Sequence, residues 1–188
     1  VKMTQIKFGT DGWRAIIAKE FTTDNVARVS LAVADFLNRK EDNPSVVIGH
    51  DCRFAGEMFA ETAAKVLAEK GVKVLLAKNF VSTPMVSLGV VNYKASIGVV
   101  ITASHNPPSY NGYKLKGDFG GPLLPNDITS VENLIPELNS VDLDSIKMED
   151  LVRDGKVEYI NLEDDYCKHA ENSFDLDSIR NSDLKLAY

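Results

Sequence analysis

One short segment of the sequence gathers several side chains that can take part in chemistry. Ser104, His105, Asn111 and Lys114 lie within eleven residues, directly after the apolar run 95–101. A serine hydroxyl can act as a nucleophile or carry a phosphoryl group, and a histidine or lysine can take up or release a proton. This segment is therefore the first candidate for a catalytic or anion-binding loop.

Two other interpretations of the same segment are open. The short polar side chains of Thr102, Ser104 and Asn106 could simply hydrogen-bond the turn to itself. Alternatively, Ser104 and His105 could belong to a hydrolase triad. The sequence has no G-x-S-x-G elbow, however, and adjacent residues of an extended chain point to opposite sides. Acyl transfer is therefore disfavoured.

Pro107 and Pro108 should make the segment stiff. Each proline fixes a backbone angle and removes an amide donor, and the residue before each proline is pushed towards an extended conformation. We therefore expect a rigid loop that holds Ser104 in one place.

A second cluster lies near the N-terminus, where residues 9–14 read GTDGWR. Its two glycines allow a tight turn whose amides can approach an anion, and Arg14 offers a forked, permanent cation suited to phosphate. The simpler interpretation is a plain turn followed by an exposed arginine.

A third cluster, GHDCR at residues 49–53, follows a predicted strand. Asp51 and Arg53 either brace their own loop as an ion pair or contribute to a functional site. In the second case the cations of the three clusters could converge with Ser104 on one phosphorylated group.

Helical and strand patterns alternate through the first two-thirds of the chain. Helices are predicted over 23–42, 56–70, 85–93 and 126–138, and strands over 45–49, 72–77, 97–101 and, at an edge of the sheet, 110–116. Because the first three strands are apolar on both faces and separated by helices, we expect an α/β fold with a mainly parallel sheet. The predicted architecture is a three-layer α/β/α sandwich with a mixed sheet, whose functional loops follow the carboxyl ends of the strands.

The pattern changes after residue 139. The segments that begin at Asp142 and Asp175 both read DLDSI, and each is expected to open a short capped helix. The acidic run 163–165 is expected to be a solvated helix face rather than a metal site. Residues 182–188 resemble the beginning of a strand.

Composition and charge exclude several classes of protein. The net charge of −6 and the pI near 5.1 argue against a non-specific nucleic-acid binder. The apolar runs are too short to span a membrane, and no signal-peptide pattern is found. Cys52 and Cys167 lack the spacing of a disulfide framework or a zinc site, so the cytoplasm is the expected location.

The three motifs also carry a family resemblance. GTDGWR at 9–14, GHDCR at 49–53 and TASHNPPSYNGYK at 102–114 resemble, in order and spacing, the α-D-phosphohexomutase superfamily, and in particular its phosphoglucomutase and phosphomannomutase members. The resemblance covers about residues 6–140, and T-x-S-H-N-P followed by N-G-x-K is highly specific. The sequence YNGYK at 110–114 is more similar to the glucose and mannose branch of the superfamily than to its glucosamine branch.

The resemblance implies a role for each chemical side chain. Ser104 would carry a phosphoryl group and exchange it with a hexose 1-phosphate or 6-phosphate through a bisphosphate intermediate. Lys114 would be the general base or acid, with His105 in support, and Arg14 would hold the phosphate of Ser104 or the charge of the transition state. An oxygen of the Ser104 phosphate would bind Mg²⁺, which prefers oxygen ligands. Support for the loop or the substrate would come from Asp51, Arg53, Asn106 and Asn111.

Other motifs of the family are not found in these 188 residues. The family binds its metal with a D-G-D-G-D-R loop in a second domain, and further domains read the sugar and clamp the distal phosphate. We therefore expect a fragment that is inactive alone, whose partners are the remaining domains of its full-length chain. Residues 1–140 would form the first domain, and residues 141–188 linker helices and the start of a truncated second domain. The alternative is a non-catalytic anion-binding or interaction module that keeps the loop as a scaffold.

Overall fold

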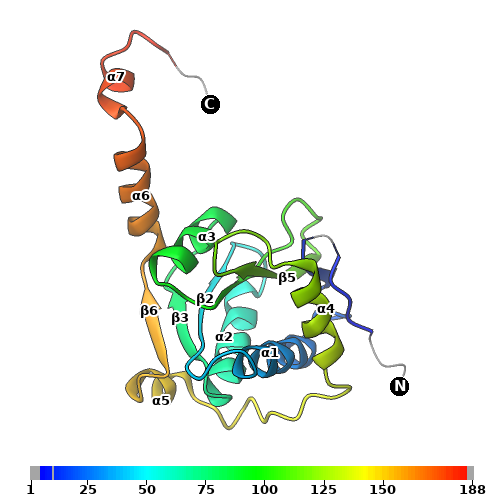
Figure 1. The fold of residues 1–188 in the computed structure, drawn as a ribbon. Helices are drawn as coiled ribbons and strands as arrows, with labels where there is room; N and C mark the ends of the chain where they lie inside the picture. Colours follow the sequence, from blue (N-terminus) through cyan, green and yellow to red (C-terminus); the bar gives the residue numbers. More distant parts are fainter. Residues whose placement is uncertain (1–4, 10, 186–188) are drawn as a thin grey trace.

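The computed structural model describes residues 5–9 and 11–185, which form one six-stranded sheet with helices on both faces (Figure 1). The strands are β1 (Trp13–Ile16), β2 (Ser45–His50), β3 (Lys73–Ala77), β4 (Ile97–Ile101), β5 (Tyr110–Gly117) and β6 (Val157–Ile160). The helices are α1 (Thr23–Asn38), α2 (Gly56–Glu69), α3 (Thr83–Asn92), α4 (Pro125–Leu134), α5 (Met148–Arg153), α6 (Leu162–Ser173) and α7 (Leu176–Arg180).

The sheet has the order β1-β5-β4-β2-β3-β6. Strands β4, β2, β3 and β6 run parallel to one another, whereas β5 is antiparallel to both of its neighbours, β4 and β1. The predicted three-layer α/β/α sandwich with a mixed, mainly parallel sheet is confirmed.

Alternation along the strands divides the core into two layers. In β2, Val46 and Ile48 pack with α1 and α2, whereas Val47 packs with α3 on the opposite face. The second layer also contains Leu162 at the start of α6, which lies against Gly89 of α3. Both faces of the central strands are thus apolar, as strands that helices cover on both sides require.

Two strands were not predicted, and for a third strand the position within the sheet was predicted wrongly. Strand β1 has four residues and directly follows the GTDG turn, and β6 buries only Val157 and Ile160, so neither has a long apolar run. Because β1 pairs with β5, residues 110–117 form an inner strand and not the edge strand that the sequence suggested.

The segment after residue 120 corrects three further expectations. Helix α4 ends at Leu134, not at 138, because Pro136 holds Ile135 in an extended conformation with ψ of 114°. At Asp142 the chain forms only a turn. Residues 182–185 are not in a strand, and residues 186–188, the rest of that predicted strand, lie outside the described residues.

Two expectations for the C-terminal helices agree with the structure. Asp175 caps α7, since its side chain accepts a hydrogen bond of 3.0 Å from the amide of Ser178. The acidic run 163–165 lies in the first turn of α6, where carboxylates are favoured by the helix dipole. Helices α6 and α7 extend away from the body of the domain (Figure 1). Among the described helices, none has the length and apolar character needed to cross a bilayer.

Three aromatic rings in mutual contact connect β1 to the core. Trp13 stacks on Phe21 with ring centroids 4.7 Å apart, and Phe21 meets Phe59 of α2 edge-on at the same distance. Phe21 is fully buried. The strand that carries Arg14 is therefore fixed to α2 through Phe21.

We predict that Phe21→Ala lowers the free energy of unfolding by roughly 3–5 kcal/mol, because it removes a buried ring and leaves a cavity. Urea denaturation would measure the change. Phe54→Ala is the control: Phe54 is 78% exposed, so its removal should change stability by less than about 0.5 kcal/mol. Equal effects of the two substitutions would contradict the anchoring role of Phe21.

Candidate active site

The three sequence clusters lie at one end of the sheet. Strands β2 and β4 are parallel, so the segment after His50 and the segment after Ile101 leave the sheet at the same edge. Strand β5 begins at this edge. Its partner β1, in which Trp13 lies opposite Tyr113, places the N-terminal turn beside Lys114 of β5. In Figure 1 the loop between β4 and β5 rises next to the N-terminal segment.

Ser104 stands exposed in this loop, and its backbone has a left-handed conformation with φ of 56°. This conformation is uncommon for a residue other than glycine and persists only where the surroundings enforce it. The amide of Ser104 donates to Oγ1 of the buried Thr102 at 3.0 Å, and Thr102 Oγ1 donates to Asp51 Oδ2 at 2.5 Å. The serine is thereby tied to the loop that follows β2.

Arg53 holds the same loop through its carbonyl groups. Its Nη1 donates to the carbonyls of Pro107 and Tyr110 at 2.9 and 3.0 Å. Its Nη2 donates to the carbonyls of Ser104 and Asn106 at 2.8 and 2.7 Å, and its Nε lies 3.5 Å from Asp51 Oδ2. Every nitrogen of the guanidinium thus has a partner within the protein. Arg53 and Asp51 brace the loop, and Arg53 does not face the pocket as a free anion ligand.

We predict that Arg53→Lys loosens the loop although it keeps the charge, because an ammonium group cannot reach four carbonyls in a plane. Each hydrogen bond to a charged group contributes roughly 1.5–3 kcal/mol, so amide exchange in the loop should rise at least about tenfold. The amides of Asn106 and Tyr110, which bond to carbonyls inside the loop, would report the change.

The control for this prediction is Arg153→Lys, because Arg153 is exposed and pairs with nearby carboxylates of α5 and its end. It should leave exchange in the loop unchanged. Unaltered exchange in Arg53→Lys would mean that the two prolines alone keep the loop rigid.

A hollow of about 460 Å³ lies beside the loop and is lined by Lys7, Gly9, Asp11, Gly12 and Arg14. Arg14 Nη1 donates to Asn106 Oδ1 at 2.8 Å, so this cation is connected directly to the serine loop. Arg14 Nη2 lies 3.8 Å from Asp11 Oδ2. The predicted residues Arg14 and Asn106 are therefore in contact.

Lys114 reaches the same place from β5. Its side chain is only 5% exposed, and its Nζ donates to Asp11 Oδ2 at 2.6 Å. Gly12 makes this approach possible: its φ is +98°, and a Cβ there would lie 2.7 Å from the carbonyl oxygen of Tyr113 and 2.9 Å from Lys114 Cγ.

The pairing of β1 with β5 explains why these cations share a face. Arg14 is opposite Gly112, and Lys114 and Lys116 follow at two-residue intervals on the same side of the sheet. Tyr113 and Leu115 point to the other side, into the core. The buried hydroxyl of Tyr113 lies 3.2 Å from Ser30 Oγ of α1, and burial raises the pKa of this tyrosine.

The charges in the hollow influence one another. Burial would raise the pKa of Asp11, but the hydrogen bond from Lys114 and the charges of Lys114, Lys116 and Arg14 outweigh it and hold the pKa below its usual value. Burial lowers the pKa of Lys116; Asp11 opposes this effect and Lys114 adds to it. Asp11 is therefore ionised across the physiological range.

The structure corrects the expectation that Ser104 and His105 point apart. Because the chain at Ser104 is left-handed and not extended, Ser104 Oγ lies 3.5 Å from His105 Nδ1, at the limit of a hydrogen bond. Asn111 is buried; its Oδ1 accepts from the amide of Gly112 and its Nδ2 lies 3.5 Å from the Phe54 carbonyl. Asn111 therefore joins the start of β5 to the loop after β2.

Asp11 and Lys116 are members of the site that received no role from the sequence patterns. Asp11 stands inside the GTDG motif, but a turn residue gives no sign of its partner on a distant strand. Lys116 could have been found from strand alternation, since it lies two residues after Lys114. Among the described residues, no group of three or more His, Cys, Asp and Glu is arranged to hold a metal ion.

Comparison with known proteins agrees with this geometry. The family model described as phosphoglucomutase/phosphomannomutase, alpha/beta/alpha domain I, matches residues 5–142. The chain therefore belongs to the phosphoglucomutase/phosphomannomutase family and contains its domain I.

Similar proteins include phosphoglucomutases of two staphylococci. The protein from Staphylococcus saprophyticus is 34% identical over 165 residues, which cover 84% of this chain and 29% of that protein. The one from Staphylococcus haemolyticus is 34% identical over 190 residues, which cover 98% of this chain and 34% of that protein. The chain thus spans about a third of the length of these relatives.

Solved structures show the same fold. A crystal structure from Thermus thermophilus, assigned as a phosphomannomutase, superposes with a TM-score of 0.84 and 35% identity over 94% of this chain and 38% of that chain. The Paramecium phosphoglucomutase parafusin has a TM-score of 0.77 at 16% identity, covers 98% of this chain and 39% of its own, and supports the fold alone.

Proposed function

We propose that this chain is the phosphoserine-bearing domain of a phosphohexomutase, which interconverts hexose 1-phosphate and hexose 6-phosphate through a bisphosphate intermediate. The observation that carries the proposal is the placement of Ser104, exposed on a loop that Arg53 fixes and next to the hollow that contains Arg14 and Asp11. The names of the staphylococcal relatives support this class of reaction.

In the proposed reaction, Ser104 begins with a phosphoryl group on Oγ. A hydroxyl oxygen of the hexose monophosphate attacks phosphorus, and the hydroxyl proton passes to Nζ of Lys114. The bond from phosphorus to Ser104 Oγ breaks, and the departing Oγ takes a proton from His105. The product is a hexose bisphosphate. After this intermediate reorients, Ser104 Oγ returns its proton to His105 and takes the other phosphoryl group, and Lys114 returns its proton to the hydroxyl that is released.

The cations of the hollow suit this chemistry. A phosphoryl group in transfer carries charge on its three equatorial oxygens, so positioned cations supply most of the catalysis. Arg14 lines the hollow, where Nη1 donates to Asn106 and Nη2 lies 3.8 Å from Asp11 Oδ2. His105, beside Ser104 Oγ, would assist proton movement as a supporting acid or base.

The proposed cofactor is Mg²⁺, which would neutralise phosphate charge when bound. The phosphate on Ser104 would give it one oxygen ligand, and Mg²⁺ requires about six in an octahedral arrangement. We propose that the other ligands, and turnover itself, come from the further two-thirds of length that the relatives possess. The isolated domain would then be inactive. In the full-length chain it would act together with the remaining domains, in the cytoplasm, on glucose or mannose phosphates.

The proposed division of the chain is a catalytic-loop domain over 1–140 and a linker with the start of a second domain over 141–188. Strand β6 lies in the second segment and completes the sheet beside β3. The linker therefore contributes to the fold of the first domain before α6 leaves it.

Ser104→Ala should abolish phosphorylation without unfolding the protein. Intact mass spectrometry of the full-length protein, incubated with a hexose 1,6-bisphosphate, should show one added phosphoryl group that is lost in this variant. The free energy of unfolding should change by less than about 1 kcal/mol, because the hydroxyl is exposed. Ser109→Ala, an exposed serine of the same loop, should keep the phosphoryl group.

The same experiment separates the alternative function. If the full-length protein takes up no phosphoryl group but still binds inorganic phosphate, the chain is an anion-binding module that keeps the loop as a scaffold. Phosphorylation of Ser104→Ala at an unchanged level would exclude Ser104 as the carrier.

Lys114→Met should fold but lose turnover. We expect kcat of the full-length mutase to fall by about 10²–10⁴, the usual contribution of a general base or acid. Lys168→Met, which removes an exposed lysine of α6, should leave kcat unchanged. A thermal melt would check folding, and near-normal turnover of Lys114→Met would rule out this lysine as the base.

A further inference from the structure

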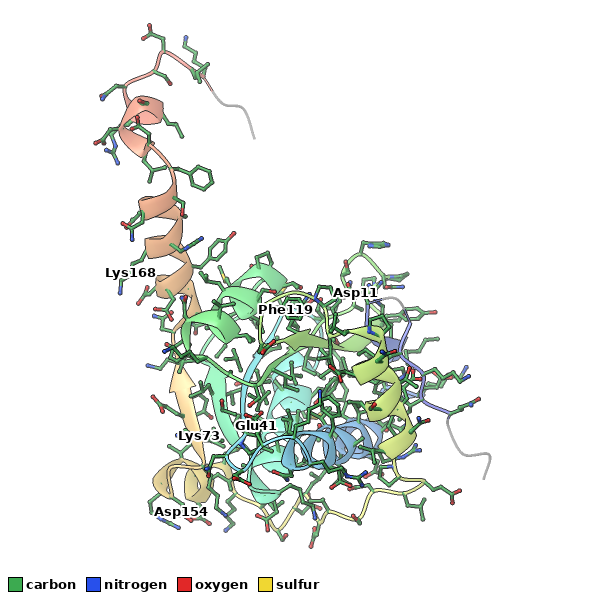
Figure 2. The ribbon with its side chains drawn as sticks, viewed as in Figure 1. Asp11, Glu41, Lys73, Phe119, Asp154 and Lys168 are labelled. Carbon is green, nitrogen blue, oxygen red and sulfur yellow. The ribbon has the colours of Figure 1, made fainter. Side chains whose placement is uncertain are left out.

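We propose that Asp11 is a positioning residue of this site: its carboxylate holds the ammonium of Lys114 and the guanidinium of Arg14 beside the loop that bears Ser104. The inference rests on the proposed function and deepens it, because it gives a role to the turn between Gly9 and Gly12. Figure 2 shows Asp11 near the loop that joins β4 to β5, far from Asp154 at the other end of the molecule.

One oxygen of Asp11 contacts both cations. Its Oδ2 accepts from Lys114 Nζ at 2.6 Å and lies 3.8 Å from Arg14 Nη2. Arg14 in turn donates to Asn106 Oδ1 at 2.8 Å. A continuous line of polar contacts therefore runs from the proposed base on β5, through Asp11, to the serine loop.

The backbone of the turn fits this role. The amide of Gly9 donates to the carbonyl of Gly12 at 3.0 Å, and Gly12 lies directly against the backbone of Tyr113 and the side chain of Lys114. A larger residue in place of Gly12 would push the turn away from β5. The turn is therefore held where the carboxylate of Asp11 reaches the end of the Lys114 side chain.

The balance of charge makes Asp11 important. Four cationic side chains surround its carboxylate or line the same hollow: Lys7, Arg14, Lys114 and Lys116. Like charges in a partly buried site repel one another strongly, and a buried lysine needs a partner. Without Asp11 the ammonium of Lys114, whose side chain is 5% exposed, would move away from Arg14 or towards solvent.

The effect of Asp11 should also be measurable in the pKa of Lys116, because Asp11 and Lys114 shift that pKa in opposite directions. Asp11 raises the pKa of Lys116 and Lys114 lowers it. Asp11→Asn should therefore lower the pKa of Lys116, whereas Lys114→Met should raise it. Lys114→Met should also raise the pKa of Asp11, since the largest stabilisation of the carboxylate comes from Lys114.

The test is an NMR titration of the lysine and carboxyl signals of the unphosphorylated 188-residue chain. We expect a resolved ammonium signal from Lys114 that Asp11→Asn abolishes and Asp11→Glu restores, together with opposite shifts of Lys116 in Asp11→Asn and Lys114→Met. Asp127→Asn is the matched control, because Asp127 pairs with the exposed Lys40 at 2.8 Å elsewhere on the surface. It should change neither signal.

Kinetics of the full-length mutase distinguish positioning from a purely structural role. Asp11→Asn should lower kcat by about 10-fold to 10²-fold, since misplacement by about 1 Å has effects of that size. KM for the hexose phosphate should not rise, because the substitution removes a negative charge from an anion site. Asp11→Glu should recover part of kcat.

Two results would overturn the inference: an unchanged Lys114 ammonium signal in Asp11→Asn, or a raised KM at normal kcat. The titrations need no substrate, so they are independent of the proposed function. If they change as expected while Lys114→Met keeps full activity, the contact of Asp11 with Lys114 stands and the assignment of Lys114 as the base fails.

Discussion

The guanidinium of Arg53 is the contact on which the rest of the site depends. The loop from Ala103 to Ser109 contains two prolines and therefore offers carbonyl groups with few amide donors to bond them. Arg53 donates to four carbonyls of the loop and its flank. A left-handed residue such as Ser104 costs about 1–3 kcal/mol, and even one hydrogen bond to a charged donor contributes a similar amount. The strained backbone of Ser104 is thus stable because Arg53 hydrogen-bonds the carbonyl of Ser104 and those of its neighbours in the loop.

Strand β5 connects this loop to the core. Its alternate residues have opposite environments, with Tyr113 and Leu115 in the layer of α1 and Lys114 and Lys116 on the face towards α3. Helix α3 covers β2 and β4, where Val86 and Val90 pack on Gly98. The N-terminal turn covers β5 at the site instead. The cations therefore stand on a strand whose other face is fully packed, so the site has a rigid base.

Much of the fold and part of the site could be predicted from the sequence, for identifiable reasons. Helices α1 and α2 have apolar residues at helical spacing, the inner strands β2, β3 and β4 are continuous apolar runs, and the serine loop has a specific motif. Strands β1 and β6 are too short for periodicity to reveal, and the inner position of β5 depends on its pairing with β1. Likewise, the contact of Asp11 with Lys114 joins residues 103 positions apart, and no local pattern records such a distance.

The bracing role of Arg53 also changes the electrostatics of the site. Because its donors are occupied, the charge available to an anion comes from Lys7, Arg14, Lys114 and Lys116, which Asp11 partly neutralises. A phosphate on Ser104, as proposed, would add about −1.5 to −2 charge. Four cations against one carboxylate leave a surplus of three positive charges, which exceeds the charge of the phosphate by about one, in a chain whose net charge is −6. The cations of the site can therefore balance the charge of a phosphoryl group although the chain as a whole is acidic. When the phosphoryl group is absent, Asp11 keeps these cations in place.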